Sequence, residues 1–114
     1  MTDTAAMATD GHAAELPPDP ISPEAILSGA PEAGDLLLRS FEGWTLGIWE
    51  ISPGVIQDTE LDEVFVILRG RATVECSNGE ELSLHPGVVG SFAAGTETVW
   101  RIHETLRKVY WAKG

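Results

Sequence analysis

Glu63 is the acidic residue whose position in the sequence best suits it to chemistry. It opens the apolar run Val64-Phe65-Val66-Ile67-Leu68. Side chains on a β-strand alternate between two faces, so Glu63 shares a face with Phe65 and Ile67 if this run is a strand. A carboxylate on an apolar face has a raised pKa and can act as a general acid or base. The alternative is that Glu63 lies at a rim, where it is hydrated or paired with a basic residue.

Lys108 and Tyr110 are the residues that we expect to exchange a proton with Glu63. They alternate along the segment 106–112, so they share one face of a strand, and Arg107 and Trp111 share the other. The sequence leaves open which of the two faces points inward. If Lys108 and Tyr110 point inward, the candidate catalytic residues are Glu63, Tyr110 and Lys108, because acid–base chemistry needs partners within hydrogen-bonding reach.

The side chains that most often bind transition metals are scarce in this chain, which has three histidines and one cysteine. His12 lies near the N-terminus, His85 lies in the turn His85-Pro86-Gly87, and His103 has the opposite strand parity to Thr98. Cys76 cannot form a disulfide within the chain, and nothing local activates it as a nucleophile. We interpret Cys76 as a small, half-buried apolar residue.

Short strands must position these groups, because the apolar period changes to two from Asp35 onward. Asn78-Gly79 predicts a two-residue hairpin turn, since both positions tolerate a positive φ. Eight short strands without a long helix indicate an all-β sandwich or barrel. The expected strands cover residues 35–41, 45–51, 63–68, 71–76, 81–84, 88–92, 97–103 and 106–112.

The N-terminal part has a different composition. Residues 1–20 are expected to form a flexible acidic tail containing prolines, and deleting residues 1–18 should leave the fold intact. Residues 22–29 are expected to form one short helix, with Ser22 as its cap, Pro23 in its first turn and Gly29 at its end. Residues 21–114 have the length of a single domain.

The formal net charge of −11 limits the partners of the chain. An acidic protein repels phosphate groups, so we expect no nucleic-acid partner and no membrane partner. No apolar run approaches the ~20 residues of a membrane-spanning helix, and the first residues do not resemble a targeting signal, which predicts a cytoplasmic protein. The unbroken run Leu36-Leu37-Leu38 predicts a homodimer, in which Leu36 and Leu38 face the chain's own core and a second copy covers Leu37.

Two stretches resemble the paired motifs of the cupins, G-x5-H-x-H-x3-E-x6-G and G-x5-P-x-G-x2-H-x3-N. Glu63 and Gly70 fit the end of the first motif, and Gly87 and Gly95 fit the second. The strings over residues 47–54, 63–70 and 100–110 are similar to those of small single-domain cupins grouped with ureidoglycine aminohydrolase and the ethanolamine-utilisation Q-type cupins. The resemblance covers residues 24–112. It implies an all-β cupin fold, a double-stranded β-helix or jelly-roll barrel, preceded by the short helix.

The metal ligands that the resemblance implies are mostly replaced. In many cupins two His, the Glu and the later His converge on a divalent metal inside the barrel, and the aminohydrolase branch uses a Glu, two His and a Gln. This chain has Gln57, Thr59, Glu63 and Thr98 at the corresponding positions. One carboxylate and neutral oxygens would hold a divalent ion weakly. We therefore expect no metal site and no cofactor, with a weakly bound divalent metal as the alternative.

Three functions stay open at this point. We favour a cupin that binds a small molecule in its barrel without a tightly bound metal. The first alternative is an enzyme of the aminohydrolase, isomerase or lyase type that uses Glu63 as acid or base. The second is a structural or regulatory cupin with a vestigial pocket. The expected ligand pocket is lined by Gln57, Thr59, Phe65, Thr98 and Trp100.

Overall fold

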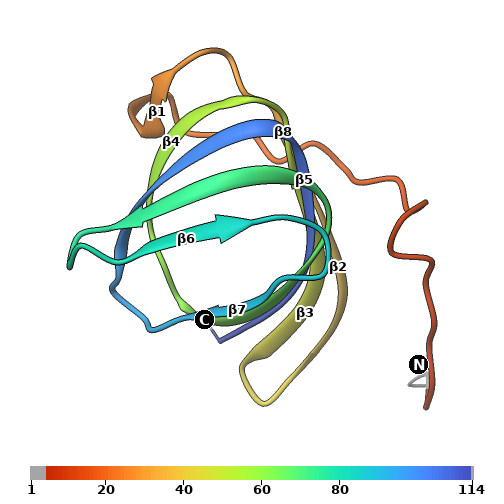
Figure 1. The fold of residues 1–114 in the computed structure, drawn as a ribbon. Coiled ribbons are helices and arrows are strands. Elements are labelled where there is room, and N and C mark those ends of the chain that lie inside the picture. The colour runs from red at the N-terminus through yellow and green to blue at the C-terminus, as the bar shows by residue number, and fades with distance from the viewer. Residues whose placement is uncertain (1–4, 114) are drawn as a thin grey trace.

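The computed structural model describes residues 5–113, and nearly all of their regular structure is β-strand. A single 3₁₀ turn, η1 (Pro23–Ala25), precedes eight strands that form one sheet curled into a barrel (Figure 1). The strands are β1 (Ile26–Ser28), β2 (Ala33–Phe41), β3 (Trp44–Ile51), β4 (Gly54–Thr59), β5 (Asp62–Cys76), β6 (Glu81–Leu84), β7 (Val89–Phe92) and β8 (Glu97–Lys113). This architecture confirms the predicted all-β barrel. No helix among the described residues is long and apolar enough to cross a bilayer.

The two longest strands, β5 and β8, close the barrel by pairing along almost their whole length, from Asp62 opposite Lys113 to Cys76 opposite Thr98. The first part of β8 also pairs with β4, and its last part pairs with β3. Such a long strand must bend, and the register of β5 shifts between Ile67 and Ala72. Gly70 lies at this bend with φ +92°, and a Cβ there would collide with the backbone of Thr105.

Several predicted elements differ from the observed ones. The segments 63–68 and 71–76 are two halves of β5, and the segments 97–103 and 106–112 are two halves of β8. The predicted helix over 22–29 is wrong except for the turn η1, because Ile26 and Ser28 pair with β4 instead. A helix of this length is marginal without tertiary support, so pairing with a neighbouring strand prevails. β4 itself was not predicted.

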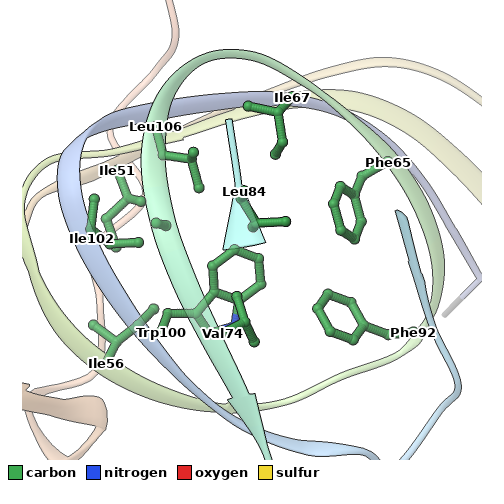
Figure 2. Packing of buried hydrophobic residues seen from close by; sticks show 11 residues of the cluster. Ile51, Ile56, Phe65, Ile67, Val74, Leu84, Phe92, Trp100, Ile102 and Leu106 are labelled. Carbon is green, nitrogen blue, oxygen red and sulfur yellow. The ribbon is translucent and has the colours of Figure 1, made fainter. Parts of the chain in front are cut away.

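The interior of the barrel is filled by apolar side chains (Figure 2). The Phe65 and Phe92 rings stack with their centroids 5.4 Å apart, and Phe92 lies 5.8 Å from Trp100. Large side chains from β5, β7 and β8 therefore meet at the centre. The cluster of buried apolar residues comprises Ile51, Ile56, Phe65, Ile67, Ala72, Val74, Leu84, Phe92, Trp100, Ile102 and Leu106.

Residues 10–20, which we call the N-terminal strap, lie against the outside of the barrel. Asp19 and Asp35 donate backbone hydrogen bonds to the carbonyls of Ala33 and Pro17, so the strap extends the β2 edge. Arg107 is buried on this outer face, and its Nη1 donates to the carbonyls of Gly11, His12 and Ala14 at 3.0, 3.4 and 2.8 Å. Of the predicted flexible tail, residues 1–4 lie outside the described residues, and residues 10–20 make these contacts.

Glu50 holds Arg107 in place from the other side. Its Oε1 accepts hydrogen bonds from Arg107 Nε at 3.2 Å and from Arg69 Nη2 at 2.7 Å. Partial burial acts to raise the pKa of Glu50, but the hydrogen bonds from the two arginines outweigh it and lower the pKa. The strap, Arg107 and Glu50 therefore form one connected polar network on the outer face.

A second surface feature is apolar. Val64, Val66 and Val89 lie exposed on the outside of β5 and β7, and Val64 pairs with Trp111, whose ring contacts Phe41 and Trp44. We call this set the outer apolar face.

The predicted face of Leu37 is wrong. Leu37 pairs with Gly47 and has the same parity as Asp35, which pairs with Trp49, so Leu37 lies on the inner side of β2 and Leu36 on the outer side. Leu37 is nevertheless 64% exposed. A run of three leucines carries no polar residue that marks the outer side, so parity alone could not settle the assignment.

We expect Arg107→Lys to destabilise the fold by about 1–2 kcal/mol, because the single ammonium group of a lysine cannot donate hydrogen bonds to Glu50 and to the three strap carbonyls at the same time. Amide exchange over residues 11–19 should accelerate, and removing residues 1–18 should lower the melting temperature, contrary to the expectation from sequence. The control is Arg71→Lys, since Arg71 pairs with Glu104 on an exposed surface and such pairs contribute under about 1 kcal/mol. Equal effects of the two changes would refute the role of Arg107.

A homodimer stays a prediction, now placed on the outer apolar face. Val89→Glu should shift the molar mass in light scattering from dimer to monomer without lowering the melting temperature, because Val89 is 73% exposed. Leu37→Glu, which is similarly exposed on the opposite side of the sheet, is the control and should leave the mass unchanged. A monomeric wild-type protein at micromolar concentration would contradict the prediction.

Candidate functional site

A cavity of about 200 Å³ lies at the end of the barrel where β4 ends and β5 begins. It takes side chains from six parts of the chain: the strap, β2, β3, the end of β4 with the loop that follows, β5 and β8. Most of these side chains are charged, unlike the apolar interior beside them. The lining residues are Asp19, Asp35, Trp49, Asp58, Glu60, Glu63, Lys108 and Tyr110.

The centre of the cavity wall is a buried ion pair. Lys108 Nζ lies 2.6 Å from Glu63 Oε2, and the two side chains are 7% and 11% exposed. Burial raises the pKa of Glu63, and the attraction of Lys108 opposes this shift only in part. In the ladder Glu63 lies opposite Ala112 and Lys108 lies opposite Ile67, so the two residues share the inner face four register positions apart, and their side chains span this offset.

The Lys108 ammonium is also surrounded by aromatic rings. It lies 4.9 Å from the ring centres of both Trp49 and Trp100, and Phe65 and Tyr110 lie at 5.3 and 5.9 Å. A cation at such distances is attracted to the faces of aromatic rings. The barrel interior therefore accommodates one alkylammonium group, with a carboxylate and four rings around it.

A second pair of polar groups joins β8 to β2. Tyr110 Oη donates a hydrogen bond to Asp35 Oδ1 at 2.7 Å. Burial raises the pKa of Asp35 despite this bond, and burial together with the Asp35 carboxylate raises the pKa of Tyr110. Gly47 makes the arrangement sterically feasible, because a Cβ at this position would collide with the Tyr110 phenol.

Glu60 is a buried carboxylate that is not among the site residues predicted from sequence. Its Oε2 accepts hydrogen bonds from Thr98 Oγ1 at 2.7 Å and from Trp100 Nε1 at 3.0 Å. The backbone of Glu60 pairs with that of Thr96 and Gly95, which fixes the direction of its side chain. Asp58 and Glu60 have the parity of buried Ile56, so recognising β4 as a strand would have revealed both.

The structure brings together part of the predicted site. Glu63, Lys108 and Tyr110 line the cavity, and Trp49, Asp35, Asp58, Glu60 and Asp19 join them unpredicted. Phe65 and Trp100 belong to the packed core beneath it, and Thr98 is buried beside Glu60. Gln57 and Thr59 are exposed on the outer side of β4, where the Gln57 amide donates to the carbonyl of Glu24, so they do not line this cavity. Together with Thr98 they line a separate, open pocket of about 690 Å³.

The residues present do not fit a divalent metal at the position that the cupin motifs indicate. Of the four corresponding residues, Gln57 and Thr59 lie outside, Thr98 donates its hydroxyl to Glu60, and Glu63 is engaged by Lys108. Within residues 5–113, no group of three or more His, Cys, Asp or Glu is arranged to hold a metal ion. The ammonium of Lys108 lies against the one acidic ligand of the motif that the chain retains.

Residues 41–110 match the model of the EutQ-like cupin domain. The chain belongs to this family. None of the curated proteins matches its sequence.

Solved structures support the same fold. The EutQ protein of Clostridium difficile is similar with a TM-score of 0.65 and 16% identity, over 74% of this chain and 69% of that one. A putative ethanolamine utilization protein Q of Salmonella typhimurium gives a TM-score of 0.60 and 20% identity, over 75% and 70% of the chains. A protein of unknown function from Pseudomonas syringae, of the DUF861 family, reaches 0.80 at 22% identity, with 90% of this EutQ-like cupin matching 46% of that chain.

We expect Asp35→Asn to raise the melting temperature of this EutQ-like cupin at pH 7–8. A folded-state pKa above the ordinary carboxyl value means that stability is lost as the pH rises through that pKa, and Asn removes this loss while still accepting the Tyr110 hydrogen bond. The difference between variant and wild type should shrink as the pH falls toward the ordinary carboxyl pKa, because protonation of Asp35 removes the penalty in the wild type. The titratable groups that face Asp35 are Asp19, Lys108 and Tyr110, and all three are present in both proteins. A variant that is less stable at neutral pH would contradict the expected penalty.

Proposed function

We propose that this EutQ-like cupin binds a small polar molecule in the barrel cavity without a tightly bound metal. The observation that carries the proposal is the Lys108–Glu63 ion pair in the cavity wall, because it engages the retained acidic ligand with a lysine ammonium. Buried ion pairs seldom add stability over apolar residues of similar volume. A buried ion pair in a cavity wall is therefore better suited to contacting a ligand than to stabilising the fold.

The cavity offers a ligand three kinds of contact. Lys108 has N–H groups beyond the one that meets Glu63, and Tyr110, Asp35 and Asp58 add oxygen atoms. The Trp49 side chain supplies an aromatic wall. A concave site with an apolar wall and a few convergent polar groups is typical of small-molecule binding.

A second candidate function is catalysis, and the distance between Glu63 and Lys108 favours it. At 2.6 Å the two groups are within proton-transfer reach, and the Tyr110–Asp35 pair lies beside them. A reaction of the aminohydrolase, isomerase or lyase type would then use Glu63 as acid or base, with Lys108 as its proton partner. The third alternative, a vestigial pocket, requires Phe65 and Trp100 to close the barrel, and the cavity above them weighs against it.

Metal independence is tested directly by elemental analysis. The purified protein should carry far less than one transition metal per chain, and a chelator should leave its melting temperature unchanged. Lys108→Met should destabilise the protein by about 3 kcal/mol at neutral pH, because Glu63 then stays buried without a counter-charge. One metal per chain that resists mild chelation and is lost in Glu63→Gln would overturn the proposal.

Binding is tested by titrating a labelled protein with a set of small neutral, cationic and anionic compounds. The indole N–H signal of Trp49 and the ring signals of Tyr110 should shift, while those of Trp44 and Trp111 on the outer face should not. Compounds that bind without moving Trp49 or Tyr110 would place the ligand elsewhere and refute the cavity as the site.

A further inference from the structure

We infer that the ligand of the cavity is a small organic cation, an aliphatic amine whose ammonium group is held among the carboxylates at the cavity wall. This inference rests on the proposed function and names the ligand class for the same site. It is carried by three features of the cavity: the sign of the charges that face it, the way in which Lys108 is already held there, and its size.

The first feature is an imbalance of charge. Five carboxylates line the cavity, and Lys108 is the only basic side chain among the lining residues. The arginines with described ion pairs bind acidic residues that do not line the cavity. Arg69 and Arg107 bind Glu50, Arg71 pairs with Glu104, and Arg101 pairs with Glu75. Among the described ion pairs, one involves a cavity carboxylate, that of Glu63 with Lys108. The exposed Asp19 and Asp58 are also in reach of solvent, and the charge of the remaining carboxylates is met by hydrogen bonds or by a ligand.

Hydrogen bonds meet this charge only in part. Asp35 accepts one from Tyr110, Glu60 accepts those of Thr98 and Trp100, and Asp58 accepts one from the backbone of Thr59. These are neutral donors, which compensate a buried carboxylate less than a cation does. Burial accordingly raises the pKa of Asp35, and partial burial together with the Glu60 carboxylate raises the pKa of Asp58. A bound ammonium would remove the penalty of ionising these acids.

The second feature is that the barrel already holds one alkylammonium group. Lys108 Nζ pairs with Glu63 and lies within 5.9 Å of four aromatic ring centres, and two of these rings, Trp49 and Tyr110, also line the cavity. A ligand amine on the open side of the same rings would meet Asp35 and Asp58 as Lys108 meets Glu63. The methylene groups of the amine would lie against Trp49.

The third feature is size. A volume of about 200 Å³ is the share of six or seven water molecules, at roughly 30 Å³ each. A chain of a few carbons with one or two amino groups fits this space, whereas a polycation or a nucleotide does not. A divalent metal fits less well, because the described residues offer no set of three ligands with suitable geometry.

The test compares three probes of equal chain length and different charge: propane-1,3-diamine, propane-1,3-diol and malonate. Calorimetric titration of the full chain at pH 7.5 should give at least tenfold tighter binding for the diamine than for the diol and no binding for malonate. The Trp49 and Tyr110 signals should move with the diamine. Affinity should fall as the pH drops through the raised carboxyl pKa values, because protons then compete with the amine.

Two variants separate the cavity from the acidic surface, which attracts amines nonspecifically at a net charge of −11. Asp35→Asn, which keeps the Tyr110 hydrogen bond, should weaken diamine binding at least fivefold. Glu104→Gln removes the same charge from an exposed outer position and should change the affinity less than twofold. Equal effects of the two variants would mean surface adhesion and would overturn the inference.

The remaining outcomes distinguish this inference from the proposed function. If the diol or malonate moves Trp49 and binds more tightly than the diamine, the cation class is wrong and small-molecule binding stands. If Mg²⁺ or Mn²⁺ binds more tightly than the diamine and loses affinity in Asp35→Asn, the cavity is a metal site and both statements fail. If neither these probes nor the broader set of compounds moves Trp49 or Tyr110, both also fail.

Discussion

The pairing of β5 with β8 is the constraint on which the rest of the structure depends. These two strands contact each other along 62–76 and 98–113, and β8 then supplies partners for β3 and β4 as well. One continuous strand in two parts of the barrel must turn sharply, and Gly70 permits the turn at the point where the Thr105 carbonyl approaches. The same ladder places Glu63 and Lys108 on one inner face, four register positions apart, and their side chains meet there in the ion pair of the cavity wall.

The cavity wall is electrostatically costly, and the fold offsets the cost nearby. Removing Glu63, Asp35 and Lys108 from water is unfavourable unless hydrogen bonds and opposite charges replace the hydration. Next to them, in the barrel interior, the packed rings of Phe65, Phe92 and Trp100 bury apolar surface, which stabilises the fold. The barrel thus has an apolar interior that stabilises the chain and, at the end where β4 meets β5, a polar cavity whose side chains can contact a ligand.

Much of the strand pattern could be predicted from sequence, because strong alternation and turn residues determine it locally. The Asn78-Gly79 turn does separate β5 from β6, and Glu63 does share a face with Phe65. β4 escaped prediction because its polar end, Gln57-Asp58-Thr59, carries no apolar alternation. Assigning the two motif histidine positions to Gln57 and Thr59 selected the outer face, and a difference of one residue reverses every side chain. The strap could not be predicted, because its contacts depend on a distant arginine.

The way in which Arg107 holds the strap has a consequence for how this segment can diverge among related chains. The guanidinium recognises three main-chain carbonyls, of Gly11, His12 and Ala14, and every amino acid carries such a carbonyl. Side-chain identity at 12 and 14 is therefore under little selection from this contact, whereas the number of residues between the anchor and Pro17 is fixed by the reach of the chain. Relatives that share Arg107 should vary in amino-acid type along this segment but keep its length. A sequence comparison that scores only amino-acid identity would therefore overlook this contact.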